Sequence, residues 1–297
     1  MTALPELPLE SWERTKETLH LWAQIVGKVK LASSPPRNHW WHVPLYVDVR
    51  GLTTRRLHSP DDVTFQIDFD FVDHLLRVRR PDVEASFELV DGLSVAAFDE
   101  KLHKAMRGLG VDVAIRESPF GVPMTTPFPD DEEHASYDRD AVERFWRILD
   151  WTDGVFEEFA GWYCGKTSPV HLFWHSLDLA VTRFSGRRAP VSPTAGLVTR
   201  EAYSHEVVSF GFWAGDRNVR EPAYYSYTAP EPDGLRDSPL SPDAARWSET
   251  LALLPYGVVR TAAAPRATLL AFLDSAYQAG AGAAGWDRDD LRSSWCP

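Results

Sequence analysis

Histidine, tyrosine and glutamate side chains gather in two stretches of the second half of the chain, and histidine in particular exchanges protons near neutral pH. The first stretch, residues 168–190, reads SPVHLFWHSLDLAVTRFSGRRAP and contains His171. The second places Tyr203 close to His205 and Glu206. A histidine beside a carboxylate and a phenol is suited to general acid–base catalysis. The sequence therefore nominates His171, Tyr203, His205 and Glu206 as catalytic residues.

The same residues also have structural interpretations. His171 is equally consistent with a core histidine whose ring bonds to a backbone carbonyl. Glu206 is equally consistent with an ordinary surface ion pair to Arg200. The residue types alone leave both interpretations open.

A divalent metal site is a further alternative. On one extended strand, His171 and His175 would lie ~13 Å apart at ~3.3 Å per residue, too far for one metal with ligand bonds of ~2.0–2.1 Å. A site would therefore draw on several strands, for instance through His171, His205 and Glu206. No phosphate-binding loop or nucleophile elbow occurs, so no nucleotide cofactor is expected and the cofactor stays unknown.

Aromatic and basic residues near these groups could bind a small molecule. Aromatic rings suit a planar or apolar ligand, and arginines suit an anionic group. Alternatively, the rings form the core of a sheet and the arginines pair with buried carboxylates. The candidate substrate-binding residues are Trp41, His42, Trp174, His175, Arg183, Arg187, Tyr224 and Tyr227.

Asp178 lies within an apolar stretch, and we expect its side chain to be buried. A buried carboxylate must be paired or hydrogen-bonded, or its pKa rises. The arginines that follow it, Arg183, Arg187 and Arg188, are the expected partners, with backbone N–H groups as the alternative. Asp70, in the stretch TFQIDFDFV, is likewise expected to need an ion-pair or hydrogen-bond partner.

These residues need strands and helices to position them. Residues 170–184 are rich in β-branched and aromatic residues, which predicts one long strand. Residues 64–72 alternate apolar and polar residues, which is typical of a half-buried strand. Apolar residues at helical spacing predict helices over residues 12–26, 94–109 and 140–163, with the first ending at glycine. The predicted fold class is α+β with antiparallel strands.

The two halves of the chain repeat the same order of features. In each half a helix and a Gly-Lys pair precede a Trp-His pair, at Trp41 and at Trp174. We infer an internal duplication of a helix–strands–helix unit, with a ligand cleft between the halves. Chance similarity between two α+β halves is the alternative. The predicted divisions are a first half at residues 1–117, a Pro-rich acidic linker at residues 118–138 and a second half at residues 139–297.

Long motifs of this chain resemble those of an uncharacterised bacterial family with a domain of unknown function. The matching stretches include NHWWHVPLYV, SPVHLFWHSLDLAVTRFSGRRAP and EAYSHEV, and the resemblance extends over essentially the whole chain. It implies no known activity. Members of the family often carry a small residue where this chain has His175, which leaves His171 as the stronger catalytic candidate.

Composition excludes several classes of protein. The chain has 31 Lys and Arg against 43 Asp and Glu, so its formal net charge is −12, which disfavours binding to nucleic acid or anionic membranes. No apolar run approaches the ~20 residues of a membrane span, and the N-terminal residues lack a signal-peptide pattern. Two cysteines make no disulfide framework. We therefore expect a cytoplasmic protein.

Two functional hypotheses follow from these residues. One is an enzyme, of hydrolase, lyase or isomerase type, that acts on a small molecule in a cleft between the halves. The other is a non-catalytic protein that binds a small ligand in an aromatic pocket or assembles as a homodimer. The enzyme hypothesis predicts that His171 and the segment from Tyr203 to Glu206 converge on one accessible cavity, whereas the binding hypothesis predicts an apolar cavity with those groups elsewhere.

Overall fold

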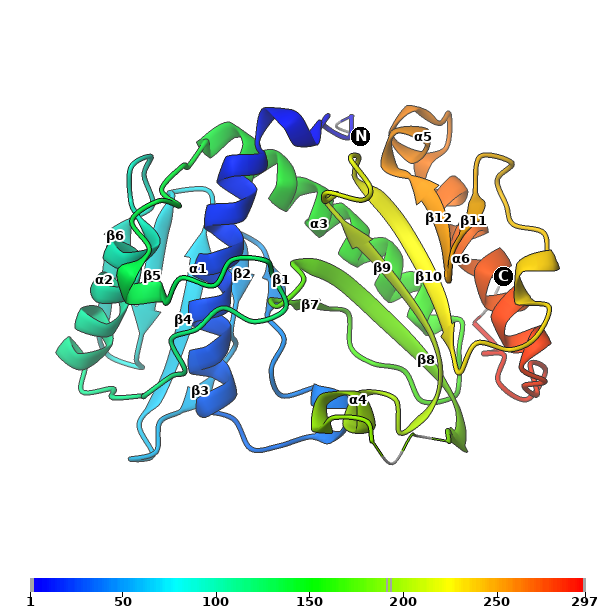
Figure 1. Ribbon diagram of the computed structural model, residues 1–297, viewed down its shortest axis with the longest axis horizontal. Helices are drawn as coiled ribbons and strands as arrows, with labels where there is room; N and C mark the ends of the chain where they lie inside the picture. The colour runs from blue at the N-terminus through cyan, green and yellow to red at the C-terminus, as the bar shows by residue number, and fades with distance from the viewer. Residues whose placement is uncertain (1–2, 191, 193, 296–297) are drawn as a thin grey trace.

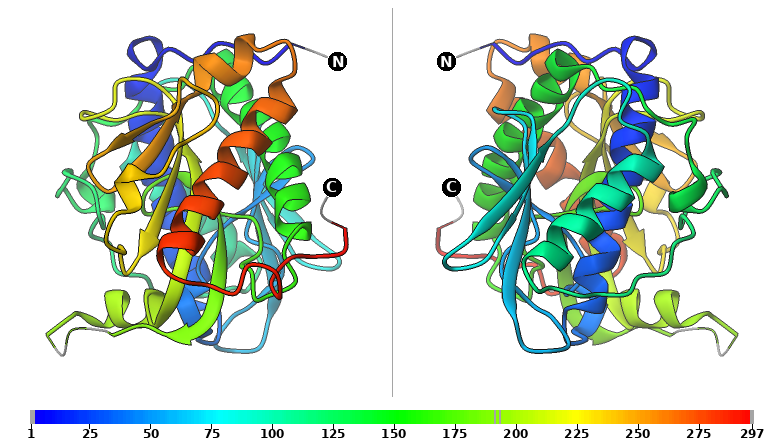
Figure 2. Two further views of the ribbon diagram at one scale, coloured as in Figure 1. Left: turned by 90° about the vertical axis from the view of Figure 1, so that its right-hand side faces the viewer. Right: turned by 90° about the vertical axis from the view of Figure 1, so that its left-hand side faces the viewer.

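The computed structural model describes residues 3–190, 192 and 194–295, and its two antiparallel sheets lie side by side (Figure 1). Helices α1 (Glu13–Ala32) and α2 (Val95–Gly108) cover one face of the first sheet (Figure 2). Helices α3 (Arg139–Gly161) and α6 (Pro265–Ala283) pack against one face of the second sheet. This arrangement confirms the α+β class with antiparallel strands.

The first sheet shows the alternation predicted for residues 64–72. Phe65 and Phe69 are buried, whereas Asp68 and Asp70 lie on the opposite face and pair with arginines. In spatial order the strands are β1 (Tyr46–Asp48), β2 (Gly51–Thr53), β4 (Thr64–Asp70), β5 (Leu75–Arg79) and β6 (Glu84–Glu88), and β3 (Leu57–His58) pairs with β4.

The second sheet carries its helices on one face and leaves much of the other open. Two short helices, α4 (Leu197–Ala202) and α5 (Tyr256–Thr261), lie at its ends. In spatial order its strands are β11 (Arg246–Ser248), β12 (Leu251–Pro255), β10 (Ala223–Ala229), β9 (His205–Trp213), β8 (Asp178–Arg188) and β7 (His171–Phe173). Short 3-10 helices occupy Leu9–Ser11, Asn38–Trp40, Phe128–Asp130 and Leu235–Asp237.

The prediction of one strand over residues 170–184 is wrong. β7 and β8 form an antiparallel hairpin in which His171 pairs with Ala180, and residues 174–177 make the turn. Leu177 takes a left-handed backbone conformation with φ of 54°, which is uncommon for a residue other than glycine. Because none of the four turn residues is Gly, Pro, Asn or Asp, the strongest sequence signals for a turn are missing, and Ser176 alone is a common turn residue.

The predicted end of the first helix is also wrong. α1 continues through Gly27 to Ala32, although the three helices fall close to the predicted ranges. Gly27 serves packing instead, since a Cβ atom there would lie 2.2 Å from the ring of Trp174. In the described part of the chain, no helix combines the length and apolar character that a bilayer crossing requires.

A pair of backbone hydrogen bonds joins the edges of the two sheets. The amide of Leu45 donates to the carbonyl of Leu172 at 2.9 Å, and the amide of Leu172 donates to the carbonyl of Leu45 at 2.8 Å. Each half of the chain thus contributes a helix, a sheet and a closing helix, joined near β1 and β7. The order agrees with an internal duplication but does not establish it, and the duplication stays a hypothesis.

Candidate functional site

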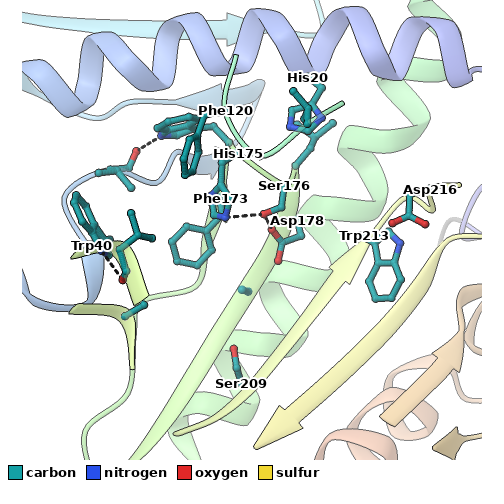
Figure 3. Close-up of a pocket in the computed structure, with 18 of the residues that line it drawn as sticks. His20, Trp40, Phe120, Phe173, His175, Ser176, Asp178, Ser209, Trp213 and Asp216 are labelled. Atoms are coloured by element: carbon teal, nitrogen blue, oxygen red, sulfur yellow. Dashed lines mark hydrogen bonds between the residues drawn. The ribbon is translucent and has the colours of Figure 1, made fainter. Parts of the chain in front are cut away.

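A cavity of about 1000 Å³ lies between α1 and the open face of the second sheet. Residues 114–116 of the predicted first half, residues 120–124 of the predicted linker and the β7–β8 turn border it, and Figure 3 shows Phe120 beside His175 of that turn. Its wall is largely apolar and contains several aromatic rings, which favours an apolar or planar occupant. The aromatic lining residues are Trp40, Trp41, Phe120, Phe173, Trp174, Phe184, Tyr203, Trp213, Tyr225 and Tyr227.

A segment of the predicted linker covers the β7–β8 turn of the second half. The buried amide of Gln24, on α1, fixes Phe120 through two hydrogen bonds: its Nε2 donates to the Phe120 carbonyl at 2.9 Å, and its Oε1 accepts the Phe120 N–H at 2.8 Å. The Phe120 ring lies 6.1 Å from the imidazole of His175 (Figure 3). Both halves of the chain therefore build this end of the cavity.

One buried polar group of the cavity lining is the carboxylate of Asp178, which is 7% exposed at the start of β8. The Ser176 hydroxyl donates to its Oδ1, and the Tyr225 hydroxyl donates to its Oδ2. His175 Nε2 lies 3.5 Å from the Ser176 oxygen. Burial of Asp178 agrees with the prediction, whereas its partners are hydroxyl groups and not arginines or backbone N–H groups.

The alternation of strand β8 explains why the expected arginines are absent. Asp178 and Arg183 are an odd number of residues apart, so their side chains point to opposite faces of the sheet. The Arg183 guanidinium stacks 3.6 Å from the Phe159 ring centroid on α3, beneath the sheet. Arg187 pairs with Glu206 at 2.7 Å, and Arg188 lies ten residues away, roughly 33 Å along an extended chain. None of them reaches Asp178.

Gly211 gives Tyr225 the space to reach Asp178. These two residues are paired across β9 and β10, and a Cβ atom at Gly211 would lie 2.3 Å from the Tyr225 ring. The ring therefore crosses β9 at the one position in the pair without a side chain. Trp213 packs beside it, with ring centroids 5.2 Å apart. Position 211 thus requires glycine for packing around the carboxylate.

Burial sets the protonation of the groups around Asp178. It lowers the pKa of His175, an effect that the nearby Asp178 charge opposes. Burial, followed by the Asp178 charge, raises the pKa of Tyr225 well above its usual value, so the phenol stays a donor. Burial also lowers the pKa of His20, on the adjacent face of α1, to about 4. At neutral pH this end holds neutral imidazoles and a protonated phenol.

The other end of the cavity carries a second polar cluster. Tyr203 and Tyr227 approach each other with hydroxyl oxygens 3.2 Å apart. The His39 Nε2 atom lies 2.7 Å from the Lys166 ammonium nitrogen, and its ring lies 5.6 Å from that of His205. Burial, and then the charge of Lys166, lowers the pKa of His39. This imidazole is therefore the acceptor of a lysine N–H.

The structure brings five of the sequence-predicted residues to the cavity and leaves the others outside its lining. Tyr224 points to the helix side of the second sheet, where its hydroxyl lies 3.2 Å from that of Thr152. His42 accepts the Arg37 N–H at 3.2 Å through Nδ1. Those in the lining are Trp41, Trp174, His175, Tyr203 and Tyr227; those outside it are His42, His171, Arg183, Arg187, His205, Glu206 and Tyr224.

His171 lies in the core between the two halves and does not line the cavity. It is 1% exposed, and neither ring nitrogen has a hydrogen-bond partner among the described residues. Burial, followed by the charges of Lys30 and Arg55, lowers its pKa to about 3. The carbonyl partner proposed for a core histidine is thus missing, and the neutral ring packs edge-on to Phe173 at 4.6 Å.

The three residues proposed for a metal site do not meet. Glu206 accepts hydrogen bonds from Ser185 and Arg187, whereas the ring of His205 lies beside that of His39. Among the residues that the structure describes, no group of three or more His, Cys, Asp or Glu side chains is placed to hold a metal ion.

Several cavity residues were not identified from the sequence as site residues. Alternation could have found Tyr225, because it shares a face of β10 with Tyr227, whereas Tyr224 does not. Asp178 was identified only as a buried structural acid. The residues contributed by distant segments left no local signal; they include His20, His39, Phe120, Ser209 and Trp213.

The fold and the cavity define an α+β protein with an aromatic-walled pocket between its first helix and its second sheet. The chain belongs to a family of unknown function, DUF5996, whose model matches residues 4–293. No curated protein and no solved structure matches the chain.

Proposed function

We propose that the protein binds a small, largely apolar molecule in the aromatic cavity, with Asp178 as its polar anchor. The observation that carries this proposal is the buried Asp178 carboxylate, held by two hydroxyl donors at the wall of a cavity of about 1000 Å³. Cavities of roughly 300–1,000 Å³ with aromatic walls and few polar groups are typical of small-molecule sites.

The positions of the predicted catalytic residues support the binding hypothesis over the enzyme hypothesis based on His171, Tyr203, His205 and Glu206. His171 and Glu206 lie away from the cavity, and Tyr203 lines it at the end opposite the β7–β8 turn. An apolar cavity with these groups elsewhere is the arrangement that the binding hypothesis predicts.

A catalytic role remains a second proposal, and one observation favours it. A neutral imidazole, a hydroxyl and a carboxylate follow one another from His175 through Ser176 to Asp178. A neutral imidazole can accept a proton from a ligand, provided that the ligand reaches it. His175 would then be the general base in place of His171, with the reaction type left open among hydrolysis, elimination and isomerisation.

Thermal unfolding in the presence of small aromatic compounds tests the binding proposal. A ligand at 100 times its Kd adds about 2.7 kcal/mol of stability to the folded state. We expect at least one compound to raise the Tm of the wild type and to lose this effect in Thr182→Phe, which fills the cavity from β8. Val49→Phe, at an exposed position, is the matched control and should keep the effect.

An equal rise in Tm for Thr182→Phe and the wild type would place the bound compound outside the cavity. The absence of any rise across a chemically varied set would also contradict the proposal. Circular dichroism of each variant without ligand establishes that the added ring leaves the fold intact.

A further inference from the structure

We infer that the molecule bound in the cavity carries a cationic amine, and that Asp178 is the group that receives this cation. The inference rests on the proposed binding function and names its ligand class. Its basis is a buried carboxylate at the cavity wall whose hydrogen bonds, among the described residues, come from two hydroxyl groups and from no basic side chain.

The hydrogen bonds of Asp178 are those of a carboxylate. Both of its oxygens accept a hydroxyl proton, from Ser176 and from Tyr225, whereas a carboxylic acid would donate through one of them. None of the ion pairs among the described residues involves Asp178. A buried charge without an opposite charge is costly, so a cation entering the cavity would gain that compensation.

None of the basic residues that line the cavity forms an ion pair with Asp178; they are Lys16, His20, Lys28, His39, Arg116, His175 and Arg217. His175 and His20 are neutral at neutral pH because burial lowers the pKa of each. Lys16 donates to the Gly215 carbonyl, and the opposite charge that acts on it most strongly is Asp216. The hydrogen bonds that Asp178 accepts among the described residues therefore come from the Ser176 and Tyr225 hydroxyl groups and not from these basic groups.

The aromatic rings around Asp178 reinforce the preference for a cation. The faces of aromatic rings carry negative electrostatic potential, and a cation over such a face gains roughly 0.5–2 kcal/mol. The Tyr225 and Tyr227 rings stack 6.2 Å apart with planes 10° from parallel, and Trp213 packs against Tyr225. Such walls attract an ammonium group and repel a carboxylate or phosphate.

The carboxylate also retains acceptor capacity in a fixed position. Each oxygen has two lone-pair directions and uses one of them for a hydroxyl group. An ammonium N–H can occupy another at about 2.7–2.9 Å. Because Gly211 lets the Tyr225 ring lie across β9, the acceptor is oriented before any ligand arrives.

Isothermal titration at pH 7 with three compounds that share one ring tests the inference: phenethylamine, phenethyl alcohol and phenylacetate. We expect the wild type to bind the amine about tenfold or more tightly than the alcohol, since a charge-assisted hydrogen bond contributes that much. In Asp178→Asn the two should bind equally. Asp61→Asn, which removes an exposed acid outside the cavity lining, is the matched control and should keep the preference.

The outcomes separate this inference from the proposed function. Equal binding of amine and alcohol to the wild type, or an undiminished preference in Asp178→Asn, would overturn the amine inference and leave cavity binding in place. Binding of none of the three compounds by the wild type would contradict both. The same titrations with Thr182→Phe, which fills the cavity, should show no binding of any of the three compounds, and this result would show that the measured site is the cavity.

Discussion

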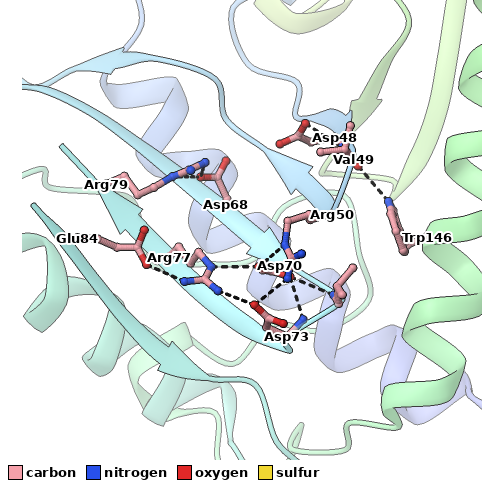
Figure 4. A network of polar contacts seen from close by, with 11 residues as sticks. Asp48, Val49, Arg50, Asp68, Asp70, Asp73, Arg77, Arg79, Glu84 and Trp146 are labelled. Carbon is pink, nitrogen blue, oxygen red and sulfur yellow. Dashed lines mark hydrogen bonds and ion pairs between the residues drawn. The ribbon is translucent and has the colours of Figure 1, made fainter. Parts of the chain in front are cut away.

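Two buried aspartates, one in each sheet, have opposite surroundings. Asp70 is 3% exposed on β4, where Arg50 and Arg77 donate to it at 2.8 and 3.0 Å and the Val72 and Asp73 N–H groups donate at 3.1 and 2.9 Å (Figure 4). Asp178, 7% exposed on β8, receives hydrogen bonds from the hydroxyl groups of Ser176 and Tyr225 among the described residues, and Figure 3 shows it beside Ser176.

The difference separates a structural acid from a functional one. Burial alone would raise the pKa of Asp70, but the hydrogen bonds from Arg50, the turn N–H groups and Arg77 lower it to about 2. Asp70 is closed to any ligand because its partners saturate it. Asp178 faces a cavity with acceptor capacity left over, so the same residue type in a similar strand position favours binding over stability.

The largest effect should come from Asp70→Ala. This change removes the acceptor for two arginines and two turn N–H groups, and the arginines are partly exposed, so we expect a loss of about 2–4 kcal/mol in unfolding free energy. Urea denaturation measures it. For Asp178→Ala we expect a loss of about 1–2 kcal/mol in unfolding free energy, because two hydroxyl groups lose their acceptor. A smaller loss in Asp70→Ala than in Asp178→Ala would contradict the assignment of Asp70 as the structural acid.

The pH dependence of stability tests the structural role of Asp70. The pKa of Asp70 is lowered in the folded state, so its stabilising contribution is full above the unfolded value of about 3.9 and is lost as the pH falls toward about 2. Asp70→Asn should therefore be less stable than the wild type at pH 6 and should approach it near pH 2. A constant difference between the two proteins over this window would contradict the account.

Gly211→Ala should have the next largest effect. The added methyl group would meet the Tyr225 ring at 2.3 Å, so the ring must move away from Asp178, at a cost of about 1–3 kcal/mol. We expect a lower Tm together with weaker binding of phenethylamine. As a control, Gly108→Ala adds a methyl group where nothing lies within 4 Å and should leave binding unchanged.

Asp178→Asn should change stability by less than about 1 kcal/mol, because the amide keeps an acceptor oxygen and the two hydroxyl groups can reorient. Thermal melts compared with those of Asp70→Asn decide the matter. A larger loss in Asp178→Asn than in Asp70→Asn would identify Asp178 as a structural acid, as the sequence had predicted.

The smallest effect at neutral pH should come from His171→Leu. Its two ring nitrogens have no partners among the described residues, so an apolar replacement should be neutral or stabilising by up to about 1 kcal/mol. Its folded pKa of about 3 lies below the unfolded value of about 6.5, so the wild type loses stability as the pH falls between them. The variant should show a shallower loss in melts from pH 7 to pH 4, whereas an identical slope would be contrary to this reading.

The sequence was sufficient to predict features that depend on local periodicity. The α+β class, the three long helices and the alternation on β4 follow from the spacing of apolar residues. The β7–β8 hairpin did not follow, because Leu177 adopts the left-handed conformation without a glycine to signal it. The extension of α1 depends on a tertiary contact between Gly27 and Trp174.

The cavity was predictable in kind but not in detail. Aromatic residues and His175 were identified from composition, and Asp178 was correctly expected to be buried. The hydroxyl partners of Asp178 were not predicted, because Tyr225 lies 47 residues further along the chain. Strand alternation alone would have excluded Arg183, which shows that parity is a stronger guide to partners than nearness in sequence.

A crystal structure of the protein with bound phenethylamine would show whether Asp178 holds a cation inside the cavity. We expect the amine nitrogen to lie about 3 Å from an Asp178 carboxylate oxygen, with the ring against Tyr225 or Trp213. An amine bound elsewhere, or an Asp178 carboxylate paired with a lysine or arginine of the chain itself, would contradict it.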